Sequence, residues 1–181
     1  AFLNLGQGDT SLEMEFYADD GRKLAVQTVQ IAAGEKRKGL IEDLFPDVTS
    51  ECSWAMVQSD EPVVGIQLYG TMGSGICGYD LTAHLSERMI LPLSVSSEQN
   101  WTGFALVNPN EAEAAASVKL LAADGSLRSE KSVVVPPKNR YKAVVADFFN
   151  GMTIHDSDYL VVVSDQPISG VGVSGDHSQT S

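Results

Sequence analysis

Two stretches of the sequence share one pattern: LEMEFYADDG at residues 12–21 and SVKLLAADG at residues 117–125. In the first, Leu12, Met14 and Phe16 alternate with glutamates, which is the period-two pattern of a strand with one solvated face. Each stretch ends in Asp-Gly, and this dipeptide between extended segments favours a tight hairpin turn with positive φ. The two stretches therefore predict a β-hairpin that occurs twice in the chain.

The rest of the sequence repeats with them. A shift of 104 residues places Asn4 on Asn108. After one extra residue enters the second copy near Gly151, residues 59–62 fall on residues 164–167. A period that holds over about seventy positions with a single adjustment predicts two copies of one supersecondary unit.

Strands account for most of each copy. Beyond the hairpins, the last two segments of each copy are predicted to be strands that pair across a turn fixed by proline. The predicted strands cover residues 12–16, 24–31, 53–58 and 63–69 in copy one and residues 117–120, 127–135, 158–164 and 168–174 in copy two.

One short helix is predicted between the hairpins of each copy, because apolar residues there recur at i, i+3, i+4 and i+7 or at similar helical spacing. The apolar positions are Tyr141, Val144, Val145 and Phe148 in copy two, and Leu40, Ile41, Leu44 and Phe45 in copy one. We therefore expect an all-β fold of two tandem β-sandwich repeats, each with one short capping helix. Residues 1–88 form the first repeat and residues 89–181 form the second. The first repeat is truncated at its N-terminal end, because nothing in it corresponds to the start of the second.

The junction between the copies leaves two assignments open. Residues 89–95 look like a strand that copy one does not contain. This strand either opens copy two, which we favour, or closes copy one. If it opens copy two, the glycine-rich residues 71–80 form a long loop or an edge strand of copy one.

Charge and hydropathy exclude several partners. The 181 residues carry a formal net charge of −12, and the longest basic run is residues 36–38. A nucleic acid or an anionic membrane surface requires clustered basic residues, so neither is expected as a partner. No apolar stretch approaches the roughly 20 residues that span a bilayer, so membrane insertion is not expected. Because the sequence opens at Ala1 without an initiator methionine, we interpret it as a mature or excised fragment of a longer protein.

Cys52 and Cys77 are the only cysteines. If residues 53–58 and 63–69 pair antiparallel, both cysteines reach the same end of the sheet once the glycines at 73 and 75 let the chain fold back. We then predict a Cys52–Cys77 disulfide in an oxidising compartment, closing a loop of about 25 residues. The alternative is two unpaired thiols in a cytosolic chain.

No catalytic, cofactor or metal motif stands out. The three histidines, His84, His155 and His177, lie in segments that do not supply the three or four converging ligands of a zinc site, so we expect them to be solvated. The sequence holds no nucleophile elbow, phosphate loop, dinucleotide fingerprint or metalloprotease helix. We expect a chain that is not an enzyme and needs no cofactor.

Aromatic residues offer one possible binding site. Tyr69, Tyr79 and Trp101 are predicted near strand ends and loops, where exposed aromatic faces can bind sugars. Packing in the core or between the repeats is the competing interpretation for the same residues.

Copy two resembles a recurring β-sandwich module of bacterial secreted and surface proteins. The resemblance rests on Asn108-Pro109, Asp124-Gly125, the diproline at 136–137 with a helix that ends in Phe-Phe, and SDQPISG at residues 164–170. Copy one departs from it, because Asn4 is not followed by proline. The resemblance implies a spacer, an adhesive element or a companion to a catalytic domain.

These observations favour a non-catalytic tandem module of an extracytoplasmic bacterial protein, located outside the cell, in the periplasm or at the cell surface. Its role would be that of a spacer or of a surface for protein interaction or adhesion. The alternative is a carbohydrate-binding module attached to an enzyme. The partner is thus expected to be a protein or a carbohydrate.

Overall fold

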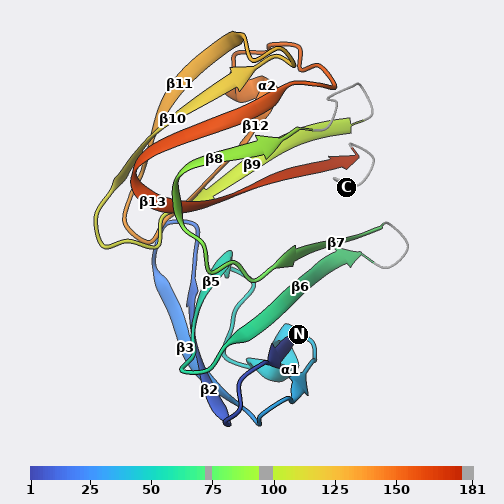
Figure 1. The fold of residues 1–181 in the computed structure, drawn as a ribbon, viewed down its shortest axis with the longest axis vertical. Coiled ribbons are helices and arrows are strands. Elements are labelled where there is room, and N and C mark those ends of the chain that lie inside the picture. Colours follow the sequence, from blue (N-terminus) through green and yellow to red (C-terminus); the bar gives the residue numbers. More distant parts are fainter. Residues whose placement is uncertain (72–74, 94–99, 177–181) are drawn as a thin grey trace. The chain divides into compact units, whose positions relative to one another are not determined.

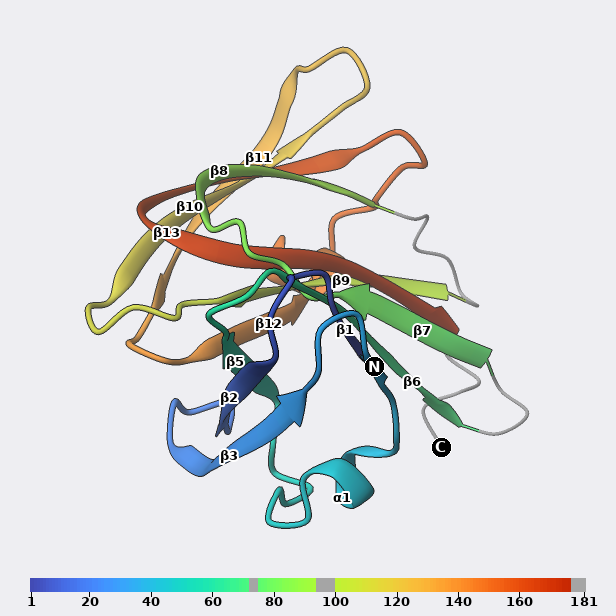
Figure 2. The same ribbon diagram turned by 60° about the horizontal axis from the view of Figure 1, so that its bottom comes forward.

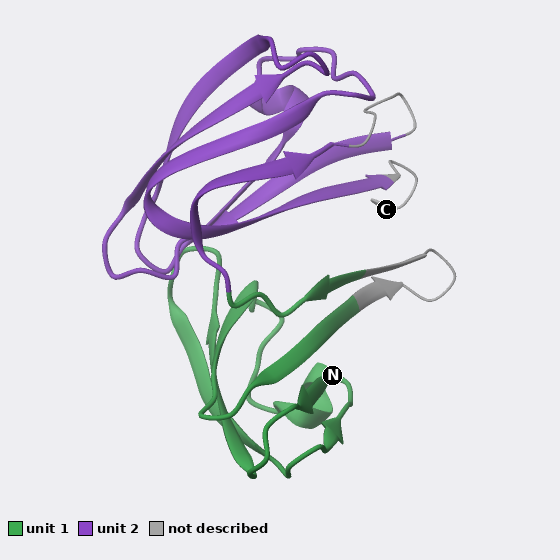
Figure 3. Cartoon of the chain, viewed as in Figure 1, with its two compact units in different colours: residues 1–83 green, residues 84–181 purple. Residues whose placement is uncertain are grey.

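A computed structural model describes residues 1–71, 75–93 and 100–176. The chain divides into two compact units, Ala1–Ala83 and His84–Ser181 (Figure 3). This division falls slightly before the boundary expected at 88/89. The described residues are mostly in strands, so the all-β fold class is confirmed. None of the helices in the described ranges has the length and apolar character that crossing a bilayer requires.

Unit 1 contains two antiparallel sheets. The first has the strand order β3-β2-β5 and the second has the order β4-β1-β6-β7 (Figure 1). The strands are β1 (Phe2–Asn4), β2 (Thr10–Tyr17), β3 (Lys23–Ile31), β4 (Lys36–Arg37), β5 (Trp54–Gln58), β6 (Val63–Thr71) and β7 (Gly75–Asp80).

The core of unit 1 lies between these sheets. Alternate residues of β2 point inward, and Leu12, Met14 and Phe16 are at most 5% exposed. Phe2 of β1 and Val63 of β6 pack against them from the second sheet. The alternation of apolar and acidic residues in β2 thus places its apolar side chains in the core, as the period-two pattern predicts.

Unit 2 repeats this arrangement. Its strands follow the order β11-β10-β13-β9-β12, and β8 also pairs with β13. The strands are β8 (Ser86–Pro92), β9 (Asn100–Val107), β10 (Ala114–Leu121), β11 (Leu127–Val135), β12 (Arg140–Val144) and β13 (Tyr159–Asp176). The register agrees with the repeat: Phe2 pairs with Gly65 in unit 1, and Leu106 pairs with Gly170 in unit 2.

The predicted pairing of the last two strands is wrong in both units. In unit 1, β5 pairs with β2 whereas β6 pairs with β1 and β7, so the two strands belong to different sheets. In unit 2, the segment expected to turn at residues 165–167 stays extended, and β13 runs as one bent strand (Figure 1 and Figure 2). Its first half pairs with β10 and its second half with β9. The proline marks a bend between sheets and not a hairpin.

The predicted helices are shorter than expected. In copy two, Tyr141 and Val144 lie in β12 and only Val145–Phe148 is helical (α2), so the helical spacing crosses a junction of strand and helix. In copy one, the helix α1 covers Ile41–Leu44. Both helices end in a buried phenylalanine, Phe45 or Phe149, and this pair of core contacts explains why both copies keep the helical turn.

The strands at the junction belong to different units. β8 pairs with β13 from Tyr159 to Val163, which places it in unit 2. β7 pairs with β6 and forms the edge of the second sheet of unit 1, which is the edge-strand alternative for the described part of residues 71–80 that follows β6, residues 75–80. Each unit therefore carries one additional strand, and the two additional strands occupy different positions of the common fold.

Candidate functional site

The strongest polar feature of unit 1 is a buried asparagine beside its first strand. Asn4 is 0% exposed, and its Nδ2 donates to the carbonyl oxygens of Gly8, Ile31 and Ala32 at 2.8, 3.3 and 3.2 Å. Its Oδ1 accepts from the amide of Gly6 at 2.8 Å. One side chain thus joins the β1–β2 loop to the end of β3.

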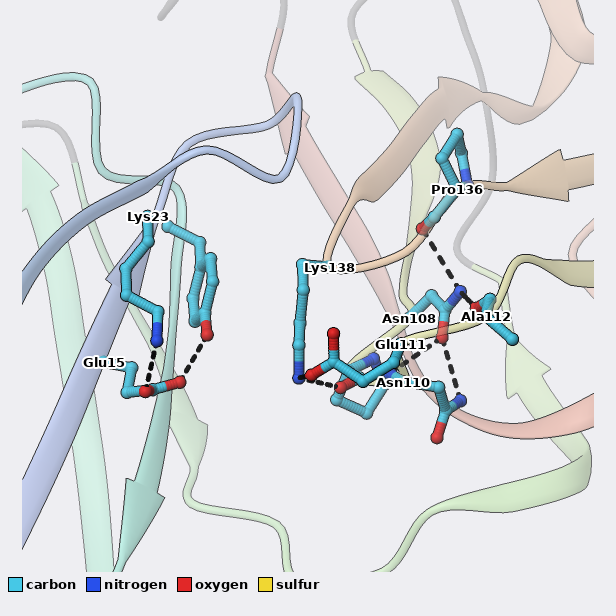
Figure 4. Close-up of polar contacts among 10 residues, drawn as sticks. Glu15, Lys23, Asn108, Asn110, Glu111, Ala112, Pro136 and Lys138 are labelled. Atoms are coloured by element: carbon cyan, nitrogen blue, oxygen red, sulfur yellow. Dashed lines mark hydrogen bonds and ion pairs between the residues drawn. The ribbon is translucent and has the colours of Figure 1, made fainter.

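Unit 2 contains the same contacts at the same spacing. Asn108, also 0% exposed, donates to the carbonyl oxygens of Ala112, Val135 and Pro136 at 2.8, 2.9 and 3.2 Å, and its Oδ1 accepts from the amide of Asn110 at 3.0 Å (Figure 4). Every partner is displaced by 104 positions from its counterpart in unit 1. The backbone amide and both side-chain ends of the asparagine are satisfied in each unit, so the residue serves the fold.

The hairpin turns are duplicated as well. Asp20 Oδ1 accepts from the amide of Arg22 at 3.0 Å, and Asp124 Oδ1 accepts from the amide of Ser126 at 2.9 Å. The glycines between them have φ of 80° and 82°, the left-handed conformation in which glycine is favoured. The hydrogen bonds from Ser126 lower the pKa of Asp124. Both Asp-Gly pairs are therefore turns, as expected.

A polar cluster without a counterpart lies on the β3-β2-β5 sheet of unit 1. The Tyr17 ring stacks on Trp54 with centroids 4.4 Å apart and planes 10° apart. The Tyr17 hydroxyl donates to Glu15, and Lys23 Nζ donates to the same carboxylate at 2.5 Å (Figure 4). The Lys23 ammonium also lies 5.7 Å from the centroid of the Tyr17 ring.

This cluster perturbs the titration of its members. Burial raises the pKa of Tyr17, and the hydrogen bond to Glu15 raises it further. The hydrogen bond to Glu15 also raises the pKa of Lys23. Both pKa shifts favour the protonated form, so the Tyr17 phenol and the Lys23 ammonium remain hydrogen-bond donors. This arrangement stabilises the outer face of the sheet and does not create a base or a nucleophile.

Trp54 leaves one polar group unsatisfied. Its Nε1 is buried and no acceptor lies within hydrogen-bond distance among the described residues. A buried indole N–H normally finds a partner, so the end of β5 is incomplete in this respect.

Unit 2 has a buried ion pair in place of this cluster. The Asp158 side chain is 1% exposed, pairs with Arg128 and accepts from the amide of His155 at 2.7 Å. Arg128 also donates to the carbonyl oxygen of Thr153 at 3.1 Å. This ion pair holds the segment between α2 and β13 in place. The positions of unit 1 that are equivalent to Arg128 and Asp158 carry no charge.

The aromatic candidates belong to both units. Tyr79 in β7 of unit 1 and Trp101 in β9 of unit 2 are both half-buried, and the side chain of Tyr69 lies outside the described residues. Trp101 lies over two glycines: a Cβ at Gly175 would be 2.8 Å from its ring and a Cβ at Gly103 would be 3.2 Å away. The glycines therefore make room for the indole on the sheet.

The predicted disulfide stays a prediction. Cys52 precedes β5, and its Sγ donates to the carbonyl oxygen of Trp54 at 3.6 Å. Cys77 lies in β7 opposite Tyr69, and its side chain lies outside the described residues. The strand pairing that was expected to bring the cysteines together does not occur, because β5 and β6 lie in different sheets.

Two of the three histidines lie within the described residues. His84 and His155 are exposed, and His177 lies outside the described residues. Within the described ranges, no group of three or more His, Cys, Asp or Glu side chains is arranged to hold a metal ion. The exposure of His84 and His155 agrees with the expectation from sequence.

Comparison with known proteins adds little to this geometry. No protein-family model matches the chain. No curated protein sequence matches it either. Among solved structures, the Anabaena sensory rhodopsin transducer is similar over 48% of this chain and 93% of its own, with 16% identity and a TM-score of 0.40.

Proposed function

We propose that the chain is a non-catalytic tandem β-sandwich module of an extracytoplasmic bacterial protein, acting as a spacer or as a surface for protein interaction or adhesion. The supporting observation is what the duplication preserves. Polar side chains with matched partners in both units, among them Asn4 with Asn108 and Asp20 with Asp124, bind their own backbone. A duplicated site for chemistry would repeat its reactive groups, and these contacts repeat structural ones.

The contacts that are not duplicated support the same proposal. The hydroxyl of Tyr17 and the ammonium of Lys23 both donate to Glu15, and Asp158 pairs with Arg128. Each of these groups is engaged by a neighbour in its own unit. Such pairs hold a surface or a loop in position, which suits a module that presents surfaces.

The extracytoplasmic location is a separate part of the proposal. It is supported by the resemblance of copy two to modules of secreted and surface proteins, and a disulfide between Cys52 and Cys77 would agree with it. Labelling of native, never-reduced protein with a thiol reagent tests it. We expect neither cysteine to react before reduction, and reaction of both would overturn the location.

A carbohydrate-binding module is the second candidate, and Trp101 favours it. Its ring lies along a sheet over Gly103 and Gly175 and remains half-buried, and aromatic rings on sheets can stack on sugars. A glycan array separates the two candidates. The spacer and interaction proposal expects no saturable binding, whereas binding that disappears in Trp101→Ala and persists in Tyr79→Ala would replace it with the carbohydrate proposal.

A further inference from the structure

The first residues of β9 carry an acceptor motif for N-linked glycosylation. Asn100-Trp101-Thr102 fits the pattern of asparagine, any residue except proline, and serine or threonine. Asn100 is the one asparagine of the chain that has a serine or threonine two positions later. In the sequence, Glu98 stands two positions before it, and bacterial oligosaccharyltransferases select acceptors with an acidic residue at that position. The sequence therefore meets the longer motif of the bacterial enzymes.

The acceptor residue of this motif lies on the surface of unit 2. Asn100 is exposed, and its pairing with Asp176 is the last pair of the ladder between β9 and β13. On the other side of β9, the ladder with β12 ends at Gly103. Asn100 thus lies at a corner of its sheet. A bulky hydrophilic group attached there can extend into solvent without displacing core side chains.

Other asparagines of the chain differ from Asn100 in burial or in sequence context. Asn4 and Asn108 are 0% exposed, and each donates to three backbone carbonyl oxygens of its own unit. Asn150 is exposed, but it is followed by Gly151 and Met152 and so lacks the hydroxyl of the motif. Exposure and the motif coincide at Asn100.

The hydroxyl of the motif is buried once unit 2 has folded. Thr102 is 1% exposed, and its Oγ1 donates to the carbonyl oxygen of Val173 at 3.3 Å. The glycosylating enzyme binds the threonine hydroxyl together with the asparagine amide, so both groups must be accessible at the same time. Pairing of β9 with β13 prevents this. Transfer of a glycan must therefore precede the folding of unit 2, while residues 100–102 are still accessible.

We propose that Asn100 is an N-glycosylation site, modified by an oligosaccharyltransferase before unit 2 folds. The inference rests on the extracytoplasmic location proposed above, because these enzymes act on chains that have crossed the membrane. In the transfer, Asn100 Nδ2 forms a bond to the anomeric carbon of an oligosaccharide carried on a polyprenyl pyrophosphate. The bond from that carbon to the pyrophosphate oxygen breaks, the polyprenyl pyrophosphate leaves, and one Nδ2 proton passes to a base of the enzyme.

Export of the full chain into the periplasm of a bacterial host that contains an oligosaccharyltransferase tests the proposal, with a host that lacks the enzyme as the blank. Intact mass and tandem spectra of the peptide that contains Asn100 measure the occupancy. We expect one glycan per chain, absent from Asn100→Gln, reduced at least tenfold in Thr102→Ala and retained in Thr102→Ser. Asn150→Gln is the matched control, because it removes an exposed asparagine outside the motif, and it should keep full occupancy.

The order of transfer and folding is tested with purified components. Leu106 is 0% exposed, so Leu106→Asp buries a charge in the core of unit 2 and prevents its folding. The wild-type chain and this variant, both produced without export, are incubated with the enzyme and its lipid-linked donor. We expect transfer to Leu106→Asp to be at least tenfold faster than transfer to the folded wild type. Circular dichroism verifies the folding state of each acceptor.

Three outcomes would overturn the proposal. An unmodified wild-type chain, in cells that glycosylate a reference acceptor protein, would show that Asn100 is not a site. The thiol labelling described above tests the location separately, so the failure of one proposal is distinguishable from the failure of the other. Occupancy unchanged in Thr102→Ala would show that the motif does not direct the transfer. Equal rates for the folded wild type and Leu106→Asp would contradict transfer before folding.

Discussion

Asn4 and Asn108 show how one side chain can define a repeat at the scale of the residue. The two N–H groups of each side-chain amide are shared among three carbonyl oxygens, one in the loop that follows the asparagine and two at the end of β3 or β11. Unsatisfied buried carbonyls are more costly than the hydrogen bonds themselves are favourable. The asparagine therefore determines the conformation of the loop, and neither aspartate nor alanine can replace its donor.

We predict that Asn108→Ala lowers the free energy of unfolding of unit 2 by about 2–3 kcal/mol, since it removes the hydrogen bonds of a buried amide to three carbonyl oxygens and to Asn110. Urea unfolding followed by Trp101 emission in a Trp54→Phe background measures unit 2 alone. Asn110→Ala serves as the control, with an expected loss of at most about 1 kcal/mol because Asn110 is only partly buried. Equal losses in the two variants would contradict the structural role of Asn108.

The ionisation of Tyr17 makes the stability of unit 1 depend on pH in the alkaline range. Its pKa is raised in the folded state, first by burial and then by its bond to Glu15, whereas the unfolded chain ionises near the ordinary value of about 10. As the pH rises above that value, the unfolded state loses the phenolic proton first, so the free energy of unfolding falls until the folded state also ionises. Below pH about 10 this contribution is fully present.

We therefore expect Tyr17→Phe to flatten the loss of stability of unit 1 between about pH 9 and pH 11. The measurement is urea unfolding followed by Trp54 emission in a Trp101→Phe background. Part of the loss remains in the variant, because the pKa of Lys23 is also raised by its bond to Glu15. An identical pH dependence in wild type and Tyr17→Phe would show that the phenol stays exposed.

At the scale of the element, the strands could be predicted from sequence because their pattern is local. The alternation in β2 and the Asp-Gly turns identify the first hairpin of each copy, and β11 was expected over the residues that it occupies. Pairing between distant strands could not be predicted from the same pattern. Whether residues after β5 turn back in the same sheet or cross to the other one depends on packing that no local spacing reports.

The same limit applies to the helix and to the candidate site. The spacing of Tyr141, Val144 and Phe148 fits a helix, yet pairing with β9 keeps the first two residues extended. The cluster of Tyr17, Trp54 and Glu15 joins residues of two strands and has no motif in the sequence. The alignment of Asn4 on Asn108, by contrast, was visible in the repeat and could have indicated the loop contact.

The close approach of β8 to β13 can be tested at Gly172. Gly172→Ala would place a Cβ 2.9 Å from the carbonyl oxygen of Pro92, and because this neighbour is backbone we expect a loss of about 1–3 kcal/mol in unit 2. The equivalent residue of unit 1 already carries a side chain, so Gln67→Ala should change unit 1 by less than about 0.5 kcal/mol. Urea unfolding of each single-tryptophan background gives both values. A tolerated Gly172→Ala would show that β8 does not approach β13 closely.

At the scale of the whole molecule, the structure describes two units with separate cores. Among the described residues, the core of unit 2 has fifteen buried side chains and that of unit 1 has six. Each core is formed by residues of its own unit. We therefore expect the units to unfold as separate events, with unit 1 the weaker.

Stretching the intact chain by its two ends in a force spectrometer tests this expectation. Two separate unfolding events should appear, each releasing about 30 nm of extended chain, given roughly 3.3–3.6 Å for each residue. The weaker event should be the one that Asn4→Ala lowers, and the stronger should respond to Asn108→Ala. A single event that releases about twice this length would show that the chain unfolds as one body.

The bent strand β13 has a consequence for how unit 2 opens. One continuous backbone belongs to both of its sheets, since the first half of β13 bonds to β10 and the second half to β9. Neither sheet can separate from the other without breaking that strand, so amide protons on both sides of the bend should exchange with solvent at one common rate set by global opening. In unit 1, the segment between β5 and β6 leaves the two sheets on separate strands. The two sheets of unit 1 can therefore open independently, and its amide protons should divide into a slowly exchanging and a rapidly exchanging set.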